Sequence, residues 1–197
     1  MSDQPELKTV NESFGSTHES EIPSEISVLP LRDTVLFPNS FIPLAVARKS
    51  SVRLVEDAVK DGSLIGVFTQ RDASTEEPSQ DDLYQVGTAT QIHKMFKLPD
   101  GTLRLIVQGL SRLRLVSLTT AHPYLKANVE STEELVTERD HLEIDALQRN
   151  IKTNFQQVVS LSPLLSDDLQ ILSTNVDEPG KLTDFIASSL TTLTTAV

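Results

Sequence analysis

Apolar and polar residues alternate along much of the first half of the chain, a period of two that is typical of half-buried β-strands. On one segment the alternating residues are Tyr84, Val86, Thr88, Thr90 and Ile92; on another, Leu103, Leu105 and Val107 fall on one face and Arg104, Ile106 and Gln108 on the other. Between the two segments, residues 98–102 read Leu-Pro-Asp-Gly-Thr, which supplies proline and glycine at turn positions. The pattern predicts a β-hairpin with its turn at 98–102.

Three shorter apolar runs predict further strands. The first begins at Ile26 and is broken by Pro30, which removes a ladder donor and favours an edge or an irregular strand end. The other two runs cover residues 41–47 and 64–68, and the polar segment 71–82 that follows them predicts a surface loop.

One helix is expected among these strands. Ser50 stands where an N-cap residue should be, and Gly62 stands where a left-handed C-terminal cap should be. Between them, apolar residues recur at helical spacing at Val52, Val55 and Val59. The segment 26–130 is therefore predicted to be a β lobe with one helix.

From about Leu135 the apolar period changes from two to 3.6, which predicts helices. The first helix should bury one face and end at Ser162-Pro163; this face comprises Ile144, Leu147, Ile151, Phe155 and Val158. A second helix is expected to start at Ser166, and a third to start near Pro179 and bury Leu182, Phe185, Ile186 and Leu190. A β lobe followed by a helical lobe at 131–197 is an α+β arrangement.

Residues 1–25 differ from both lobes in composition. This segment is rich in Ser, Glu and Asn and carries one lysine against six acidic residues. It has too few apolar side chains to offset the entropy lost on ordering. We expect an acidic, disordered leader that is dispensable for folding.

Composition limits the remaining functions. The chain has 197 residues, a net charge of -11, no cysteine and no apolar run near the ~20 residues of a transmembrane helix. The absence of cysteine excludes disulfides and thiolate metal sites and agrees with a reducing compartment, so we expect a cytoplasmic protein without a membrane partner. The strong negative charge makes nucleic acid an unfavourable partner.

No arrangement of residues predicts catalysis. The four histidines lie far apart in the sequence and form no metal-ligand spacing, so no metal is expected. The only approach to a phosphate loop is Gly180-Lys181, where Leu182 replaces the required Ser or Thr. No nucleophile motif occurs either. We therefore expect no cofactor and no enzymatic activity from this chain.

Large apolar residues near loop and hairpin ends are the candidates for protein binding: Phe37, Phe41, Met95, Phe96 and Leu98. Alternation places Met95 and Phe96 on opposite faces of a strand, so one of the two is expected in the core. A second candidate feature is a basic strip of Arg104, Arg112 and Arg114, which is more simply interpreted as three solvated strand arginines.

Several segments resemble the amino-terminal domains of Lon-type ATP-dependent proteases. The most specific run is Val28-Leu29-Pro30-Leu31-Arg32-Asp33, then Val35-Leu36-Phe37-Pro38, then Ile42-Pro43-Leu44. Further matches follow in order at 82–88, 98–102, 107–112, Pro123-Tyr124, 177–182 and 184–187. The resemblance covers residues 26–190.

This resemblance implies a PUA-like β pseudobarrel and a helical bundle that lead, in the whole enzyme, to a long helix, an AAA+ ATPase and a Ser-Lys protease domain. The chain ends before those parts, so it resembles either a piece of a longer Lon or a stand-alone Lon-domain protein. The implied function is recognition of unfolded, damaged or tagged proteins, with other Lon subunits of a hexamer as further partners. Two alternatives are a purely structural assembly element and an RNA-binding PUA-like module that would use Arg112 and Arg114.

Overall fold

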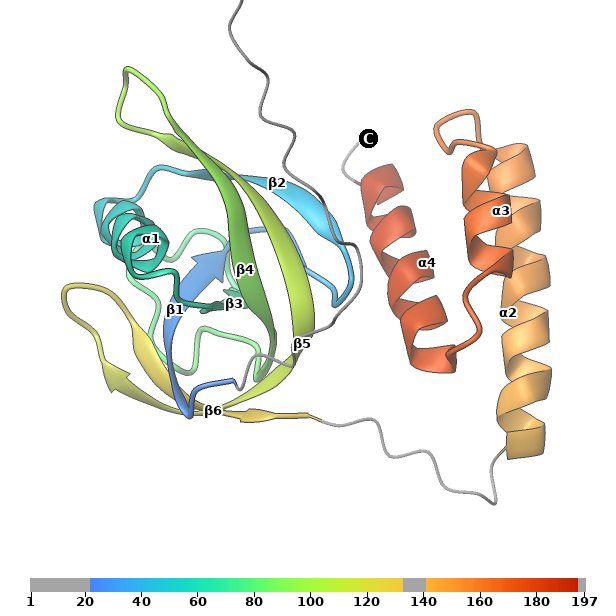
Figure 1. Cartoon of the computed structure of the whole chain (residues 1–197), viewed down its shortest axis with the longest axis horizontal. Coiled ribbons are helices and arrows are strands. Elements are labelled where there is room, and N and C mark those ends of the chain that lie inside the picture. The colour runs from blue at the N-terminus through green and yellow to red at the C-terminus, as the bar shows by residue number, and fades with distance from the viewer. Residues whose placement is uncertain (1–21, 133–140, 195–197) are drawn as a thin grey trace, which may run out of the picture.

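The computed structural model describes residues 22–132 and 141–194, which form a β-rich lobe followed by three helices (Figure 1). Most of the expected leader, residues 1–21, lies outside the described residues, as does the expected start of the first long helix near Leu135. The elements are β1 (Glu25–Leu31), β2 (Phe41–Val46), α1 (Lys49–Asp61), β3 (Ile65–Thr69), β4 (Val86–Lys97), β5 (Leu103–Thr120), β6 (Lys126–Ser131), α2 (His141–Leu161), α3 (Asp168–Thr174) and α4 (Pro179–Thr194).

The six strands form one sheet in the order β2-β5-β4-β3-β1-β6, and β6 also pairs with β5, so that the sheet curls back on itself. Among the described strands, only β1 and β3 pair in parallel, and the other pairings are antiparallel. The 18-residue strand β5 makes this closure possible, because its first half pairs with β2 and its second half with β6. The α+β prediction is confirmed, with a closed, barrel-like β lobe.

The predicted hairpin at 98–102 is confirmed and joins β4 to β5. The amide of Leu98 donates to the carbonyl oxygen of Thr102 at 2.9 Å, and the amide of Gly101 donates to that of Leu98 at 3.0 Å. Gly101 has a φ of 84°, in the left-handed region where residues with a Cβ are disfavoured. Local turn chemistry therefore sets the register of the two longest strands.

The β lobe is filled by two groups of buried side chains. One group packs α1 residues Leu54 and Val55 against Leu29, Ile65 and Leu105 of the strands. The other surrounds Phe68 on the opposite face of β1 and β3, and it contains Ile26, Val28, Leu83, Ala89, Leu113, Leu115, Ala127 and Val129. The inward positions of β5 are the ones that alternation predicts.

Helix α1 departs from the sequence prediction at its start and on its buried face. Ser50 is not the N-cap, because the helix begins at Lys49 and Arg48 is the capping residue, without a side-chain hydrogen bond. The buried residues are Ser51, Leu54, Val55 and Ala58, whereas Val59 is exposed. The buried face therefore keeps Val55, with Val52 packed beside it, and gains the small side chains of Ser51 and Ala58 in place of Val59. Gly62 caps the C-terminus with a φ of 64°, as predicted.

Helix α2 buries a narrower face than its sequence predicts. Phe155 is buried as expected, but its companion is Val159 rather than Val158, and Leu147, Ile151 and Val158 are exposed. The reason is that α2 is covered only by the short α3 and by α4 on one side (Figure 1). The helix ends before Pro163 as predicted, and Ser166 accepts a 3.3 Å hydrogen bond from the amide of Asp168 at the start of α3.

Two arginines of the predicted basic strip are held by acidic residues. Arg112 on β5 forms an ion pair with Asp184 on α4, whose side chain is buried, and this pair links the two lobes. Arg114 pairs with Glu130 on β6 at 3.1 Å. Both arginines therefore meet carboxylates of the protein itself. The division at residues 25 and 130 into leader, β lobe and helical lobe stays a prediction.

Candidate protein-binding surface

The outward side of strands β2, β5 and β4 carries large apolar side chains. Phe41 is 59% exposed, Phe96 is 56% exposed and Ile106 is 36% exposed. Pairing places Pro43 opposite Ile106, and Ala45 opposite Arg104, which in turn lies opposite Phe96. We call this surface the outer apolar face; its residues are Phe41, Pro43, Ala45, Phe96 and Ile106.

The outer apolar face follows from the alternation of strand residues. The neighbours of these residues along the strands, such as Leu44, Leu105 and Val107, point inward and are buried. Phe41 and Phe96 lie two strands and four register positions apart, which is roughly 17 Å by standard sheet spacings. A chain crossing between them would need about five extended residues. The face therefore suits an extended segment better than a single side chain.

A β-bulge shapes one end of this face. The register of β4 and β5 shifts between Ile92 and Lys94, so His93 is the extra residue. The ring of His93 lies 5.3 Å from that of Phe41, and its Nε2 is 2.8 Å from Oε1 of Gln108. The bulge thus supports Phe41 from the side while leaving most of its ring in solvent.

The five candidate residues that the sequence predicted lie in different environments in the structure. Phe41 and Phe96 are exposed on the outer apolar face, whereas Met95 is half-buried against the core, as the alternation predicts. Phe37 and Leu98 are half-buried, Leu98 in the hairpin turn and Phe37 in the loop before β2. That loop passes directly over Gly109, where an added Cβ would meet the carbonyl oxygen of Phe37 at 2.3 Å. Sequence reasoning had not included Pro43, Ala45 or Ile106.

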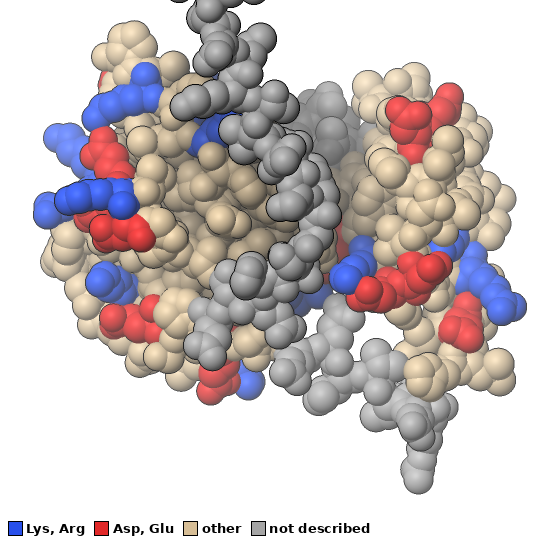
Figure 2. Space-filling view, viewed as in Figure 1, with Lys and Arg blue, Asp and Glu red and all other residues tan. Residues whose placement is uncertain are grey.

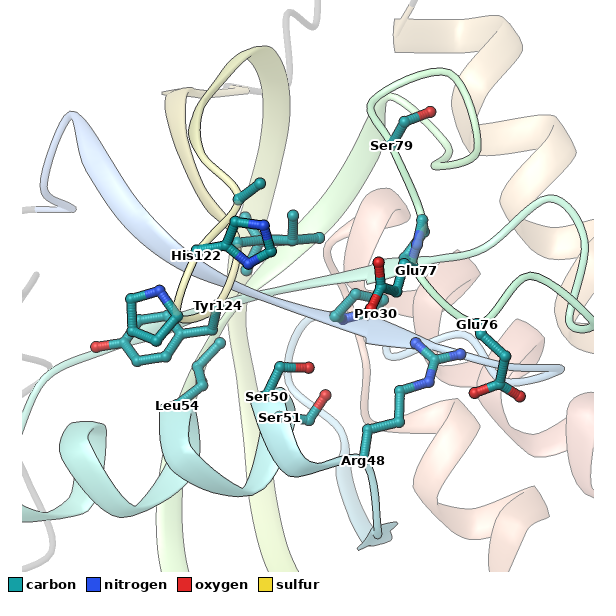
Figure 3. Close-up of a pocket in the computed structure, with 15 residues that line it drawn as sticks. Pro30, Arg48, Ser50, Ser51, Leu54, Glu76, Glu77, Ser79, His122 and Tyr124 are labelled. Atoms are coloured by element: carbon teal, nitrogen blue, oxygen red, sulfur yellow. The ribbon is translucent and has the colours of Figure 1, made fainter.

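Two cavities open beside α1 that sequence reasoning missed. The first, of about 270 Å³, lies between the start of α1, the loop before β4 and the turn between β5 and β6 (Figure 3). Tyr124 contributes to its floor, and burial together with the nearby Asp57 raises the pKa of this phenol. The second, of about 440 Å³, is lined by consecutive residues 29–32 of the β1 end and 43–47 of β2.

Arg48 and Ser51 line both cavities, together with Pro30, so the two cavities adjoin. Nη2 of Arg48 donates to Oε1 of Gln70 at 2.7 Å and to the carbonyl oxygen of Thr75 at 3.1 Å. Burial and the neighbouring Arg32 lower the pKa of Arg48. No sequence pattern indicated this site, because its residues come together only in the folded chain.

Other kinds of site find no support in the described parts of the chain. Within residues 22–132 and 141–194, no three His, Asp or Glu side chains cluster in a way that could hold a metal ion. In the same ranges, none of the helices is long and apolar enough to cross a membrane.

Comparison with known proteins connects these features to a family. The protein-family model for the ATP-dependent protease La (LON) substrate-binding domain matches residues 25–195. The chain is 42% identical over 170 residues to a Lon protease of Koribacter versatilis, covering 86% of this chain and 21% of that protein. It is 44% identical over 167 residues to a Lon protease of Dictyoglomus thermophilum, covering 85% of this chain and 21% of that protein.

The fold has a counterpart among solved structures. The N-terminal domain of the Mycobacterium avium complex Lon protease matches with a TM-score of 0.55 and 14% identity, over 83% of this chain and 98% of that one. The chain spans about a fifth of the length of the curated relatives. The matched family is a substrate-binding domain and not a catalytic one, in agreement with the expectation that this chain is not an enzyme. The chain belongs to the family of Lon substrate-binding domains, as the motifs at its strand starts and hairpin indicate.

Proposed function

We propose that this chain captures unfolded or damaged protein segments and presents them to the ATPase ring of a Lon-type protease in the cytoplasm. The observation that carries the proposal is the outer apolar face of Phe41, Pro43, Ala45, Phe96 and Ile106 on a member of a substrate-binding family. Apolar contact is non-directional, so it accepts many sequences where a fixed set of hydrogen bonds would select one.

The size of the outer apolar face fits weak and reversible capture. Its three large residues, Phe41, Phe96 and Ile106, are separated by polar neighbours such as Gln108, Arg104 and Lys94. Such a surface offers apolar anchors without one continuous patch, which would favour aggregation. A binding domain that must release its substrate to another part of the enzyme benefits from fast dissociation.

The test is binding of a permanently unfolded protein, reduced and alkylated, to the wild-type chain and to the Phe41→Ser, Phe96→Ser double variant. Binding should weaken at least about tenfold in the double variant, since two exposed aromatic anchors are lost. The matched control is Val59→Ser, Val86→Ser, which changes two exposed apolar residues elsewhere on the lobe. Equal affinity of the double variant and the wild type would contradict the proposal.

A second candidate function is assembly of subunits through the helical lobe. Beside its buried face, α2 exposes Leu147, Ile151, Val158 and Leu161, which recur at steps of four, seven and three. Spacings of three, four and seven are those of coiled-coil seams. Figure 2 shows broad uncharged areas on this lobe. The mass of the chain in solution tests this function: dimers that dissociate in an Ile151→Glu, Val158→Glu variant would support it.

The two arginines expected to bind RNA are engaged in ion pairs within the protein. Arg112 and Arg114, which would have met phosphates, form ion pairs with Asp184 and Glu130. A phosphate would have to displace both carboxylates first. Together with the net charge of -11, these pairs favour a protein partner over a polyanion.

A further inference from the structure

The start of α1 leaves several hydrogen-bond donors unused where the two cavities adjoin. The first hydrogen bond within the helix runs from the amide of Val52 to the carbonyl oxygen of Arg48 at 2.8 Å. Within the described residues, the amides of Lys49, Ser50 and Ser51 have no hydrogen-bond partner, and Arg48 provides no side-chain cap. The positive end of the helix dipole is therefore uncompensated.

A serine hydroxyl points into the same place. Ser51 is only 6% exposed as a residue and lines both cavities, and its hydroxyl oxygen opens onto them rather than being sealed in the core. Figure 3 shows the hydroxyl groups of Ser50 and Ser51 directed away from the helix into the first cavity, with Arg48 beside them. A hydroxyl that opens onto a cavity without a protein partner can hydrogen-bond to a ligand or a water molecule there.

The guanidinium of Arg48 is held by hydrogen bonds to the protein, but some of its donors have no partner. Its two hydrogen bonds, to Gln70 and Thr75, are both donated by Nη2, which leaves Nε and Nη1 without a partner in the described residues. Arg32 and Arg104 line the second cavity, and Glu76 and Glu77 line the first. Glu76 pairs with Arg32 at 3.1 Å and also lies near enough to Arg48 to act on its charge. Three arginines against two glutamates favour an anionic ligand at the junction.

The second cavity adds room for an extended chain. Strand β2 pairs with β5 and with no other described strand, and the lining of the cavity by consecutive residues 43–47 indicates that it runs along the unpaired edge of β2. An unpaired strand edge offers backbone groups to an added peptide strand. Pro43 lacks an amide hydrogen, so this edge supplies fewer donors than an ordinary strand.

We propose that the junction of the two cavities binds a carboxylate of an extended polypeptide, held by Arg48, the free amides at the start of α1 and the Ser51 hydroxyl. A carboxylate fits because it is planar, anionic and accepts several donors at once. Both the α-carboxylate at a chain end and an Asp or Glu side chain have this chemistry. The proposal rests on the proposed function, since it names which part of a captured protein is read.

The test compares three short apolar peptides, acetylated at the N-terminus and labelled for fluorescence anisotropy, on the full chain. One peptide has a free C-terminal carboxylate, one is its C-terminal amide, and one is the amide with an internal aspartate. The peptide with the free carboxylate should bind about tenfold more tightly than the plain amide, because only its carboxylate accepts charge-assisted hydrogen bonds at the site. Tighter binding of the aspartate peptide alone would assign the site to side-chain carboxylates. Equal binding of all three would overturn the proposal.

Variants at the start of α1 test whether the preference for the carboxylate peptide arises at the junction of the two cavities. Ser50→Asp places a carboxylate in the first helical turn, where acids stabilise a helix, so the chain should fold while its preference for the acid peptide disappears. Ser166→Asp makes the same charge change in the helical lobe and should keep the preference. Ser51→Ala, which removes only the hydroxyl, should reduce the preference about threefold. A full preference in both Ser50→Asp and Ser51→Ala would overturn the proposal.

Failure of this site and failure of the proposed function give different results. If only the carboxylate site is wrong, the unfolded protein still binds and still depends on Phe41 and Phe96, while acid and amide peptides bind alike. If the proposed function is wrong, the unfolded protein does not bind the outer apolar face, whatever the peptides do.

Discussion

The β lobe and the helical lobe hide their apolar residues to very different extents. In the β lobe, two groups of buried side chains fill the closed sheet, and Phe68, Leu105 and Val107 are almost completely inaccessible. In the helical lobe, the buried group consists of Phe155, Val159 and Leu165, with half-buried neighbours, while Leu161 is 84% exposed. The first lobe therefore has an extensive core, whereas the second buries only a narrow strip of side chains between its helices.

This difference has a physical cause. A sheet that closes on itself pairs most of its backbone groups and gives every strand an inward side. Three helices, one of them only seven residues long, can cover only part of each other's surface. The helical lobe therefore depends more on contacts outside itself, such as the Arg112–Asp184 pair with the β lobe.

The largest expected effect is on the core of the β lobe. Phe68→Ala should lower the free energy of unfolding by about 3–5 kcal/mol, because it removes a fully buried ring and leaves a cavity. Phe96→Ala changes the same residue type on the outer apolar face and should cost less than about 1 kcal/mol. Urea unfolding of both variants measures the contrast. Similar losses in the two variants would mean that the exposed ring packs against something in solution.

A smaller loss of stability is expected from a change in the buried group between the helices of the helical lobe. Phe155 is 3% exposed and packs edge-on against Phe185, with ring centroids 6.0 Å apart. Phe155→Ala should destabilise α2, α3 and α4 by about 2–4 kcal/mol and leave the β lobe folded. Hydrogen exchange should therefore accelerate in these helices and stay slow in β3 and β5. Equal acceleration in both lobes would show that they unfold as one unit.

The same comparison explains which elements could be predicted from the sequence. The hairpin at 98–102 and strand β5 followed from turn residues and alternation, because β5 buries alternate residues. In β4 the alternation holds less well, since Val86 is exposed and Ala89 is buried between Thr88 and Thr90. The buried face of α2 could not be predicted, since its stripe of Leu147, Ile151 and Val158 is as apolar as the residues that are buried. Periodicity identifies an apolar stripe but does not specify what covers it.

The candidate sites show a similar limit. Phe41 and Phe96 could be nominated because large apolar residues near strand ends stand out, but their shared face with Pro43 and Ile106 depends on the pairing of three strands. The cavities beside α1 had no sequence signal, because Arg48, Ser51 and Tyr124 come together only through tertiary contacts. Alternation in β4 did separate Met95 from Phe96.

The Arg112–Asp184 ion pair between the lobes should contribute less to the free energy of unfolding than the buried side chains of either lobe. Asp184→Ala removes a buried carboxylate that pairs with the partly exposed Arg112 and should cost about 1–3 kcal/mol. The loss should appear as faster hydrogen exchange in α4, with little change in β3. Arg114→Ala breaks an exposed pair with Glu130 and serves as the control, at less than about 1 kcal/mol. Unchanged exchange in α4 would mean that the pair does not hold the lobes together.

The smallest expected effect concerns the turn of the β hairpin and depends on pH. The carboxylate of Asp100 accepts a 2.9 Å hydrogen bond from the amide of Thr102, which lowers the pKa of Asp100 below its ordinary value. A lowered pKa means that the charged form stabilises the fold above an ordinary pKa of about 4, and that this contribution is lost as the pH falls through the lower folded value. Wild type should therefore melt slightly above Asp100→Ala near neutral pH.

The two melting temperatures should converge as the solution becomes acidic, because the protonated side chain no longer favours the turn. Asp72 and Asp82 also have lowered pKa values, but they are present in both proteins and cancel in the difference. A gap between wild type and Asp100→Ala that widened at low pH would reverse the sign and show that the carboxylate opposes the turn. The effect stays small because Asp100 is exposed, so water competes for the same hydrogen bond and the hairpin depends chiefly on Gly101 and the paired strands.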